Sequence, residues 1–288
     1  MPSTRRAYIV PLPGQRTLPL GERCLVMGIL NITPDSFAER FPKTDPDVAI
    51  DAALRMQDEG ADLIDIGGES TRPGAEPVSA DEERRRVLPV IERLAPQLRI
   101  PISVDTYKSE VARDAVAAGA SIINDVRGLR TDPRVATVAA ETGAALIVMH
   151  SRGVSKTMYA EAVYEDVIVD ATRELGESLV TAAARGVPRE RTIVDPGIGF
   201  AKRVAHSYGV LARLPELAAA LDRPLLVGPS RKSFMRDAIG DVRPAERDWG
   251  TAAAIAAAVL AGVHIVRVHN VAAMRQVVRV AEEVLNHG

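Results

Sequence analysis

The sequence predicts an α/β fold, a single (β/α)8 TIM barrel with a short N-terminal extension. Short apolar runs rich in β-branched residues alternate with longer stretches of helical periodicity, and this alternation repeats along the chain. The length of 288 residues also suits eight strand and helix units, which need roughly 250 residues. We expect residues 1–23 to form an extension or small hairpin and residues 24–288 to form the barrel.

Eight candidate strands follow one another from Cys24 onward, each short and apolar. They are expected at 24–31, 61–68, 101–106, 121–126, 144–150, 192–197, 224–230 and 264–270. Helices are expected near 47–59, 81–95, 108–118, 133–142, 165–185, 208–221, 248–261 and 271–286. Because every crossover between parallel strands can repeat with the same right hand, eight units favour a closed barrel over an open doubly wound sheet.

The composition is that of a globular protein with a small-molecule partner. Hydrophobic residues make up 47% and charged residues 26%, and the net charge of -2 is spread over both signs. No basic surface for nucleic acid is therefore expected. No apolar stretch approaches the length of a membrane span, and the N-terminus does not resemble a secretory signal. Cys24 is the only cysteine, which fits a reducing, cytoplasmic location.

Polar residues gather where the predicted strands end. They are Asn31, the run Glu69 to Arg72, Asp105, Asn124, His150, Asp195, the run Ser230 to Lys232, and Arg267 with His269. In α/β barrels the loops at the carboxyl ends of the strands converge on one mouth that carries the active site. Any one of these residues could instead cap a helix or satisfy a local hydrogen bond. Their repetition predicts a convergent site.

Two basic clusters in the last two units predict an anion site. Arg267 and His269 are two residues apart in a strand, so both project from the same face. The run 230–232, Ser-Arg-Lys, follows the seventh strand, and barrels often bind phosphate beside strands seven and eight. The alternative is that Arg231 and Arg267 pair with nearby carboxylates.

Short polar side chains on the other side of the mouth suit a planar heterocycle. Asp105, Asn124 and Asp195 would offer hydrogen bonds to amino, amide and ring N–H groups, although spacing alone does not separate this role from helix capping. The sequence has no H-E-x-x-H, no cysteine pair, no P-loop and no G-x-S-x-G. Zinc chemistry, a serine triad and a nicotinamide cofactor therefore lack support.

Eight segments resemble motifs of the dihydropteroate synthase family, the pterin-binding TIM-barrel enzymes, in the family's order. They are GILNITPDSF (28–37), IDIGGESTRPGA (64–75), SVDTYKSEVA (103–112), INDVRG (123–128), VMHSRG (148–153), DPGIGF (195–200), PSRKSF (229–234) and RVHN (267–270). The resemblance covers nearly the whole chain. It implies a transferase of folate biosynthesis that condenses 6-hydroxymethyl-7,8-dihydropterin diphosphate with p-aminobenzoate, giving 7,8-dihydropteroate and diphosphate. It also implies a homodimer.

The resemblance assigns roles to the matching residues. Four polar side chains would bind the pterin ring: Asp105, Asn124, Asp195 and Lys232. Three would hold the diphosphate with Mg2+, the first of them as the metal ligand: Asn31, Arg267 and His269. Further substrate contacts would come from Thr71, Arg72, Pro73, Met149, Phe200 and Ser233. The catalytic set would be Asp105, Lys232, Arg267 and His269, because departure of diphosphate needs charge neutralisation more than a strong base.

The chain departs from the family pattern in three places. It has Ala38 to Phe41 where the family commonly continues with Ser-Asp-Gly-Gly, and loss of the glycines should stiffen or redirect that loop. Ala201 stands where glycine is common, and Asn270 replaces a frequent aspartate. The first departure bears on affinity for aminobenzoate and on sulfonamide sensitivity.

Two other functions stay open. The pterin-binding barrel of methyltetrahydrofolate-corrinoid methyltransferases shares the pterin residues but needs no grip on a diphosphate. A non-catalytic pterin-binding paralogue would suit the altered first loop. The ESTRPG and SRKS segments and the pair Arg267 and His269 favour the synthase. The small apolar residues at 251–262 could be buried within the barrel or against a second subunit.

Overall fold

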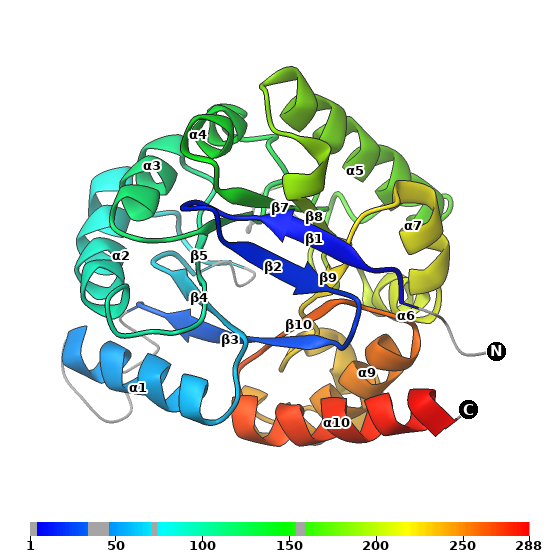
Figure 1. Cartoon of the computed structure of the whole chain (residues 1–288). Helices are drawn as coiled ribbons and strands as arrows, with labels where there is room; N and C mark the ends of the chain where they lie inside the picture. Colours follow the sequence, from blue (N-terminus) through cyan, green and yellow to red (C-terminus); the bar gives the residue numbers. More distant parts are fainter. Residues whose placement is uncertain (1–4, 34–45, 71–73, 154–158, 288) are drawn as a thin grey trace.

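The computed structural model describes residues 5–33, 46–70, 74–153 and 159–287. An eight-stranded parallel sheet forms its centre, with the strand order β8-β7-β6-β5-β4-β3-β10-β9. A parallel bridge between Val194 and Leu225 joins β8 to the segment that leads into β9, so the two edges of the sheet meet. Helices surround the sheet (Figure 1). The predicted (β/α)8 barrel is confirmed.

The barrel strands are short and almost wholly buried. They are β3 Leu25–Asn31, β4 Leu63–Gly67, β5 Ile102–Asp105, β6 Ile122–Asp125, β7 Ala145–Met149, β8 Thr192–Asp195, β9 Leu226–Val227 and β10 Ile265–Val268. Each lies within the segment expected for it. Apolar side chains occupy both faces of the strands, as expected for parallel strands covered by helices outside and packed core inside. The shortest is β9, since the flanking Pro224 and Pro229 have no N–H to donate to a ladder.

The helices also follow the expected order, with one short helix that was not expected, α8 Arg236–Ile239. They are α1 Pro46–Asp58, α2 Ala80–Leu94, α3 Ser109–Ala117, α4 Arg134–Thr142, α5 Val167–Ala184, α6 Val204–Ala212, α7 Leu214–Leu221, α8 Arg236–Ile239, α9 Asp248–Leu260 and α10 Val271–His287. The single helix expected at 208–221 is wrong. Pro215 lies in the first turn of α7 and lacks the N–H that would continue α6, so two helices form. Among the described residues, no helix has the length and apolarity needed to cross a membrane.

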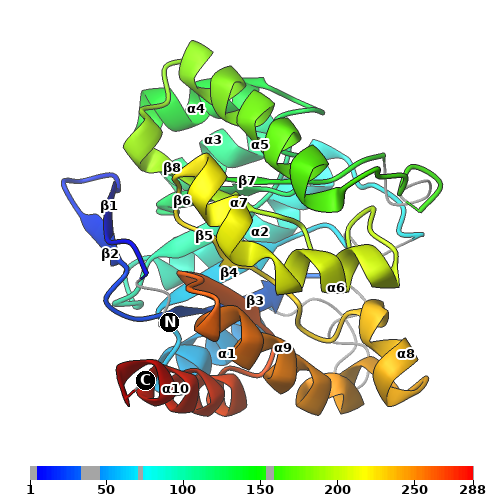
Figure 2. The same cartoon turned by 90° about the vertical axis from the view of Figure 1, so that its right-hand side faces the viewer.

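A hairpin closes one end of the barrel. Strands β1 Tyr8–Pro11 and β2 Thr17–Leu20 pair antiparallel and lie across the barrel opening (Figures 1 and 2). Four buried side chains face inward from the hairpin: Val10, Leu12, Leu18 and Leu20. They form one cluster with residues at the start of barrel strands, Leu25, Leu63, Ile122, Ala145 and Ile265 among them. The N-terminal end is thus sealed, and the carboxyl ends of the strands are left to form a site.

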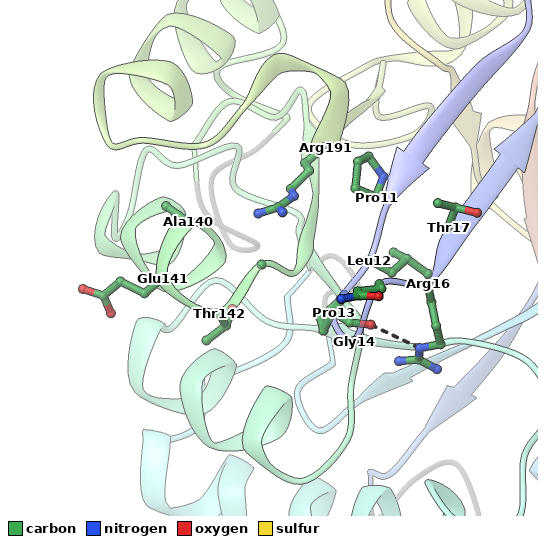
Figure 3. A pocket seen from close by; sticks show the side chains of 12 residues that line it. Pro11, Leu12, Pro13, Gly14, Arg16, Thr17, Ala140, Glu141, Thr142 and Arg191 are labelled. Atoms are coloured by element: carbon green, nitrogen blue, oxygen red, sulfur yellow. Dashed lines mark hydrogen bonds between the residues drawn. The ribbon is translucent and has the colours of Figure 1, made fainter.

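The sealed end carries a hollow of its own (Figure 3). It lies between the turn of the hairpin at 11–17, the end of α4 at 140–143, and Arg191. Arg16 at its edge donates from Nε to the Pro13 carbonyl at 3.3 Å and from Nη2 to Ser121 Oγ at 2.5 Å. Because the polar ends of the barrel strands lie at the opposite end, this hollow is separate from the site described below.

We predict that the hairpin contributes to the stability of the whole barrel. Leu18→Ala removes a side chain that is 5% exposed and should lower the free energy of unfolding by about 2 to 4 kcal/mol. The matched control is Ile9→Ala on the same hairpin, where the side chain is 60% exposed and the expected change is within about 0.5 kcal/mol. Urea unfolding measures both. Equal effects would show that the hairpin is not part of the core.

Candidate active site

A buried ion cluster formed by strands β4, β5 and β10 occupies the centre of the mouth. Arg267 donates from Nε to Asp65 Oδ2 at 2.6 Å and from Nη2 to Asp105 Oδ2 at 2.8 Å. Asn124, on β6, donates from Nδ2 to the same Asp65 oxygen at 3.0 Å. The sequence pattern predicted no role for Asp65. The available signal was a charged residue that interrupts an otherwise apolar strand.

The cluster holds two carboxylates against one guanidinium. Burial raises the pKa of Asp105 to about 8, and the neighbouring Asp65 acts in the same direction while Arg267 opposes it. A second carboxylate beside a buried carboxyl group favours the protonated form of that group. At neutral pH the cluster therefore retains a proton, and it can both donate a hydrogen bond to a ligand and accept one from it.

A tight turn after β8 forms the next part of the mouth. Asp195 Oδ1 accepts from the backbone N–H of Gly197 at 2.7 Å. Lys232, which follows β9, donates from Nζ to the Ile198 carbonyl at 2.5 Å, and the same Nζ lies 4.3 Å from the centroid of the Phe200 ring. A Cβ at Gly199 would lie 2.9 Å from Lys232 Cδ, so glycine is what permits this approach.

Burial shifts the pKa values of the two charged groups at this turn, Lys232 and Asp195. It lowers the pKa of Lys232 to about 8, with Asp195 opposing the shift. It raises the pKa of Asp195, and Lys232 is the main charge that counteracts this. The two groups lie in one dry region, where charge and hydrogen bonds act strongly on a bound molecule.

The two basic clusters have different partners. Ser230 Oγ and His269 Nδ1 are 2.9 Å apart, and the backbone N–H of His269 donates to Ser230 Oγ at 3.2 Å. Arg231 instead pairs with Asp248 at the start of α9, with Nε to Oδ1 at 2.7 Å. Pairing of Arg231 and Arg267 with carboxylates is the alternative that the sequence left open, and both arginines form such pairs. The charge of Arg231 is paired at α9, whereas that of Arg267 is shared within the ion cluster.

Glu69 fixes the start of the loop after β4. Its Oε1 accepts from the Tyr107 hydroxyl at 2.8 Å, and its Oε2 pairs with Lys108 Nζ at 2.5 Å. Lys108 also pairs with Glu83 on α2 at 2.5 Å. These contacts bind the base of the loop to the next strand–helix unit. The sequence marked Glu69 only as one of the polar residues at strand ends.

Most of the expected site residues come together at this end of the barrel. Those that end a strand, or lie on its last residues, are Asn31, Asp105, Asn124, Met149, Asp195 and Arg267. Those that follow a strand are Phe200, Lys232, Ser233 and His269. Thr71, Arg72 and Pro73, and the altered segment Ala38 to Phe41, lie outside the described residues. The particular role of each residue remains a prediction.

The fold and the mouth define a class of protein. A TIM barrel whose open end gathers buried carboxylates, an amide and cations has the features of an enzyme that acts on a small polar molecule.

Comparisons with known proteins narrow this class. The model of the pterin binding enzyme family matches residues 27–269. The dihydropteroate synthase of Synechocystis sp. is 46% identical over 94% of both chains, and that of Escherichia coli is 43% identical over 91% of this chain and 92% of its own. The chain belongs to the pterin binding enzyme family. Its activity is that of a dihydropteroate synthase, a transferase.

Solved structures agree with this assignment. Dihydropteroate synthase of Xanthomonas albilineans with 4-aminobenzoic acid is 42% identical with a TM-score of 0.87, covering 96% of this chain and 98% of that one. The Yersinia pestis enzyme in a sulfonamide drug complex is 41% identical with a TM-score of 0.89, covering 95% and 98%.

The ion cluster predicts a stability gain from loss of a site residue. Asp105→Asn leaves Arg267 balanced by Asp65 alone. Because the folded pKa of about 8 lies above the unfolded value of 3.8, the carboxyl group increasingly destabilises the fold as pH rises from about 4 to 8. We expect the variant to be more stable at pH 8 by on the order of 2 kcal/mol, with the gain shrinking toward pH 5.

Urea unfolding at both pH values measures this effect. The control is Asp58→Asn, whose carboxylate is exposed on α1 and which should show no pH-dependent gain. A variant that is less stable than the parent at pH 8 would contradict the prediction.

Proposed function

We propose that the mouth of this barrel condenses 6-hydroxymethyl-7,8-dihydropterin diphosphate with p-aminobenzoate in folate biosynthesis. The observation that carries the proposal is the cluster of Asp65, Asp105, Arg267 and Asn124. Within the described part of the chain, Asp65 Oδ1 and Asn124 Oδ1 are buried without a hydrogen-bond partner. Buried polar atoms normally have partners, and the amino and ring N–H groups of a pterin would supply them.

The pterin ring would lie between the ion cluster and the turn after β8. Asp105, Asn124, Asp195 and Lys232 would contact its polar edge, and Met149 and Phe200 would pack near its faces. A relative, the Xanthomonas albilineans enzyme, has been solved in complex with 7,8-dihydropteroate at 40% identity to this chain and a TM-score of 0.85. That complex supports a pterin in the corresponding mouth.

The diphosphate would lie toward Arg267 and His269, with Mg2+ bound at Asn31. A Cβ at Gly67 would lie 3.7 Å from Asn31 Oδ1 and 3.4 Å from Asp105 Cβ, so a side chain at position 67 would fill the space beside the amide oxygen. This space and its oxygen donor fit the ion, because Mg2+ prefers oxygen ligands and keeps several waters. When bound, the ion would supply charge neutralisation at the departing diphosphate.

The protein's own groups would stabilise the charges that develop on reaction. As the diphosphate departs from the methylene carbon, Arg267 and His269 would hold its negative charge. The carbon gains cationic character, which the buried carboxylates would favour. The aryl amine of p-aminobenzoate then attacks without prior deprotonation. Ser233, together with Thr71, Arg72 and Pro73, would hold the aminobenzoate.

We predict Mg2+-dependent formation of dihydropteroate and release of diphosphate in equal amounts from the two substrates. Lys232→Ala and Arg267→Ala should each lower kcat/KM by about 100-fold or more, because each removes a charged group from the reacting site. The control is Arg243→Ala, an exposed residue before α9, which should retain parental activity.

The same assay separates the competing functions. Binding of the pterin diphosphate without any product would favour the non-catalytic paralogue. Methyl transfer from methyltetrahydrofolate to a corrinoid, in place of condensation, would favour the methyltransferase.

A homodimer is the second part of the proposal. An exposed apolar stripe runs along α9, where Trp249 is 88% exposed and Leu260 is 41% exposed, with Ala253 and Ala257 exposed between them. These positions are spaced to lie on one helix face, and a second copy of the chain would cover them.

We also propose a cytoplasmic location. The chain has a single cysteine, Cys24, which is buried and whose pKa is raised to about 12 by burial, so it stays a thiol, as fits a reducing compartment.

We predict that Trp249→Glu converts the dimer into a monomer, because a charge in an apolar interface leaves that face unable to pack. Analytical ultracentrifugation measures the mass. The control is Val180→Glu on α5, also exposed but away from the stripe, which should leave the dimer intact. A monomeric parent protein, or a dimeric Trp249→Glu variant, would rule out this interface.

A further inference from the structure

Lys202, in the segment between β8 and α6, is the largest fully buried side chain of the described residues, with 1% exposure. A buried ammonium is costly unless it is paired and hydrogen-bonded. Its Nζ lies 2.7 Å from His150 Nδ1 and donates to the Phe200 carbonyl at 3.2 Å. The lysine therefore joins the segment after β7 to the turn after β8.

The contact continues away from the mouth to α5. His150 Nε2 lies 3.1 Å from Glu174 Oε2. Since the carboxylate accepts, Nε2 carries the histidine proton and Nδ1 accepts from Lys202. Burial lowers the pKa of His150 to about 3, and Lys202 adds to this shift, so the ring is neutral.

Glu174 anchors this chain of contacts as a carboxylate. Although burial acts to raise it, hydrogen bonds from His150 and Arg152 hold the pKa of Glu174 well below its usual range. Arg130 Nη2 also pairs with it at 2.8 Å. Lys202 therefore donates to His150, and His150 donates to Glu174, so the direction of both hydrogen bonds is fixed.

The mouth end of this chain is the turn that carries Phe200. Three of its residues have positive φ: Gly197 at 66°, Gly199 at 79° and Ala201 at 47°. The left-handed conformation costs a non-glycine residue such as Ala201 roughly 1 kcal/mol or more. Hydrogen bonds hold the carbonyls of this turn, from Lys232 to Ile198, from the adjoining Lys202 to Phe200, and from the Tyr164 hydroxyl to Ala201 at 2.8 Å.

Lys202 also acts on Asp195 electrostatically. Burial raises the pKa of Asp195, and three cations counteract this: Lys232, Lys202 and Arg267. Burial lowers the pKa of Lys202 itself to about 7, with Asp195 opposing the shift. The other charges that act on the Lys202 ammonium are Lys232, Glu174 and Arg152. Below neutral pH the ammonium is charged and favours the ionised form of Asp195.

We propose that Lys202, oriented by His150 and Glu174, is a positioning residue for the pterin pocket that holds the 197–201 turn, and with it Phe200, in place beside Asp195. This role of Lys202 rests on the proposed function in one respect, namely that Asp195 and Phe200 contact a dihydropterin. A lysine that only filled the core would affect stability but would not change KM for the pterin diphosphate selectively over KM for p-aminobenzoate.

The test uses the full chain, and thermal unfolding verifies that each variant is folded. Lys202→Met should raise KM for the pterin diphosphate by about 10-fold or more and change KM for p-aminobenzoate by less than about 3-fold. It should also move the acid limb of kcat/KM for the pterin diphosphate to higher pH by about half a unit or more, because Asp195 loses a neighbouring cation.

Two further variants separate charge from position. Lys202→Arg keeps the cation, so its acid limb should stay at the parental pH while KM for the pterin diphosphate rises several-fold. His150→Asn breaks the link to Glu174 but leaves the Lys202 charge, and the same pattern is expected. These two variants carry the test if Lys202→Met does not fold, and a parental KM for the pterin diphosphate in both would then overturn the proposal.

Calorimetric titration of pterin diphosphate without p-aminobenzoate gives an independent readout. If the protein binds this probe but makes no product, the proposed reaction fails, while the dissociation constant and its pH dependence still test Lys202. Parental pterin affinity and an unmoved acid limb in a folded Lys202→Met variant would overturn the proposal. So would equal increases in both KM values with no shift of the limb.

Discussion

The mouth depends on one guanidinium that two carboxylates share. Arg267 extends from β10 to Asp65 on β4 and Asp105 on β5, so the three strands are linked across the barrel and not only through their ladders. Removing these charges from water costs several kcal/mol per ion, and only good geometry recovers it. An acid with a raised pKa beside a fixed cation is the consequence. This arrangement both orients a heterocycle and explains why the polar atoms of the cluster are not all satisfied by the protein.

The two ends of the barrel serve different purposes, packing at one end and ligand binding at the other. At the N-terminal end the hairpin covers the first residues of the strands with apolar side chains. At the other end, polar side chains such as Asn31, Asp105 and Asp195 occupy the last residue of several strands. A barrel separates these demands along one axis, because conserving the sealed end does not constrain the loops at the open end. The hairpin therefore supports a mouth that it does not touch.

Local pattern explains which parts of the site could be predicted. The strand ends were visible because each apolar run stops at a polar residue, as at Asp105 and Asp195. Pro215 could also have predicted the break between α6 and α7. The helical periodicity on both sides of it instead suggested one continuous helix. Pairings between distant segments could not be predicted from the sequence. Arg231 pairs with Asp248 because the start of α9 lies against the segment after β9, where the Arg231 N–H also donates to Thr251 Oγ1. Lys202 contacts His150 across 52 residues of sequence. No local pattern encodes such partners, since register and helix packing decide them.

The two departures from the family pattern that lie within the described residues, Ala201 and Asn270, fall where neighbours compensate for them. Asn270 donates from Nδ2 to Asp248 Oδ2 at 2.9 Å, in a corner where Arg231 already neutralises that carboxylate. An amide adds a hydrogen bond there without adding a second negative charge. Ala201 takes a left-handed conformation that glycine adopts more readily, within a turn whose Ile198 and Phe200 carbonyls accept hydrogen bonds from Lys232 and from the buried Lys202. Charged side chains near the site therefore accommodate both substitutions: Arg231 and Asp248 at Asn270, and Lys232 and Lys202 at the turn that contains Ala201.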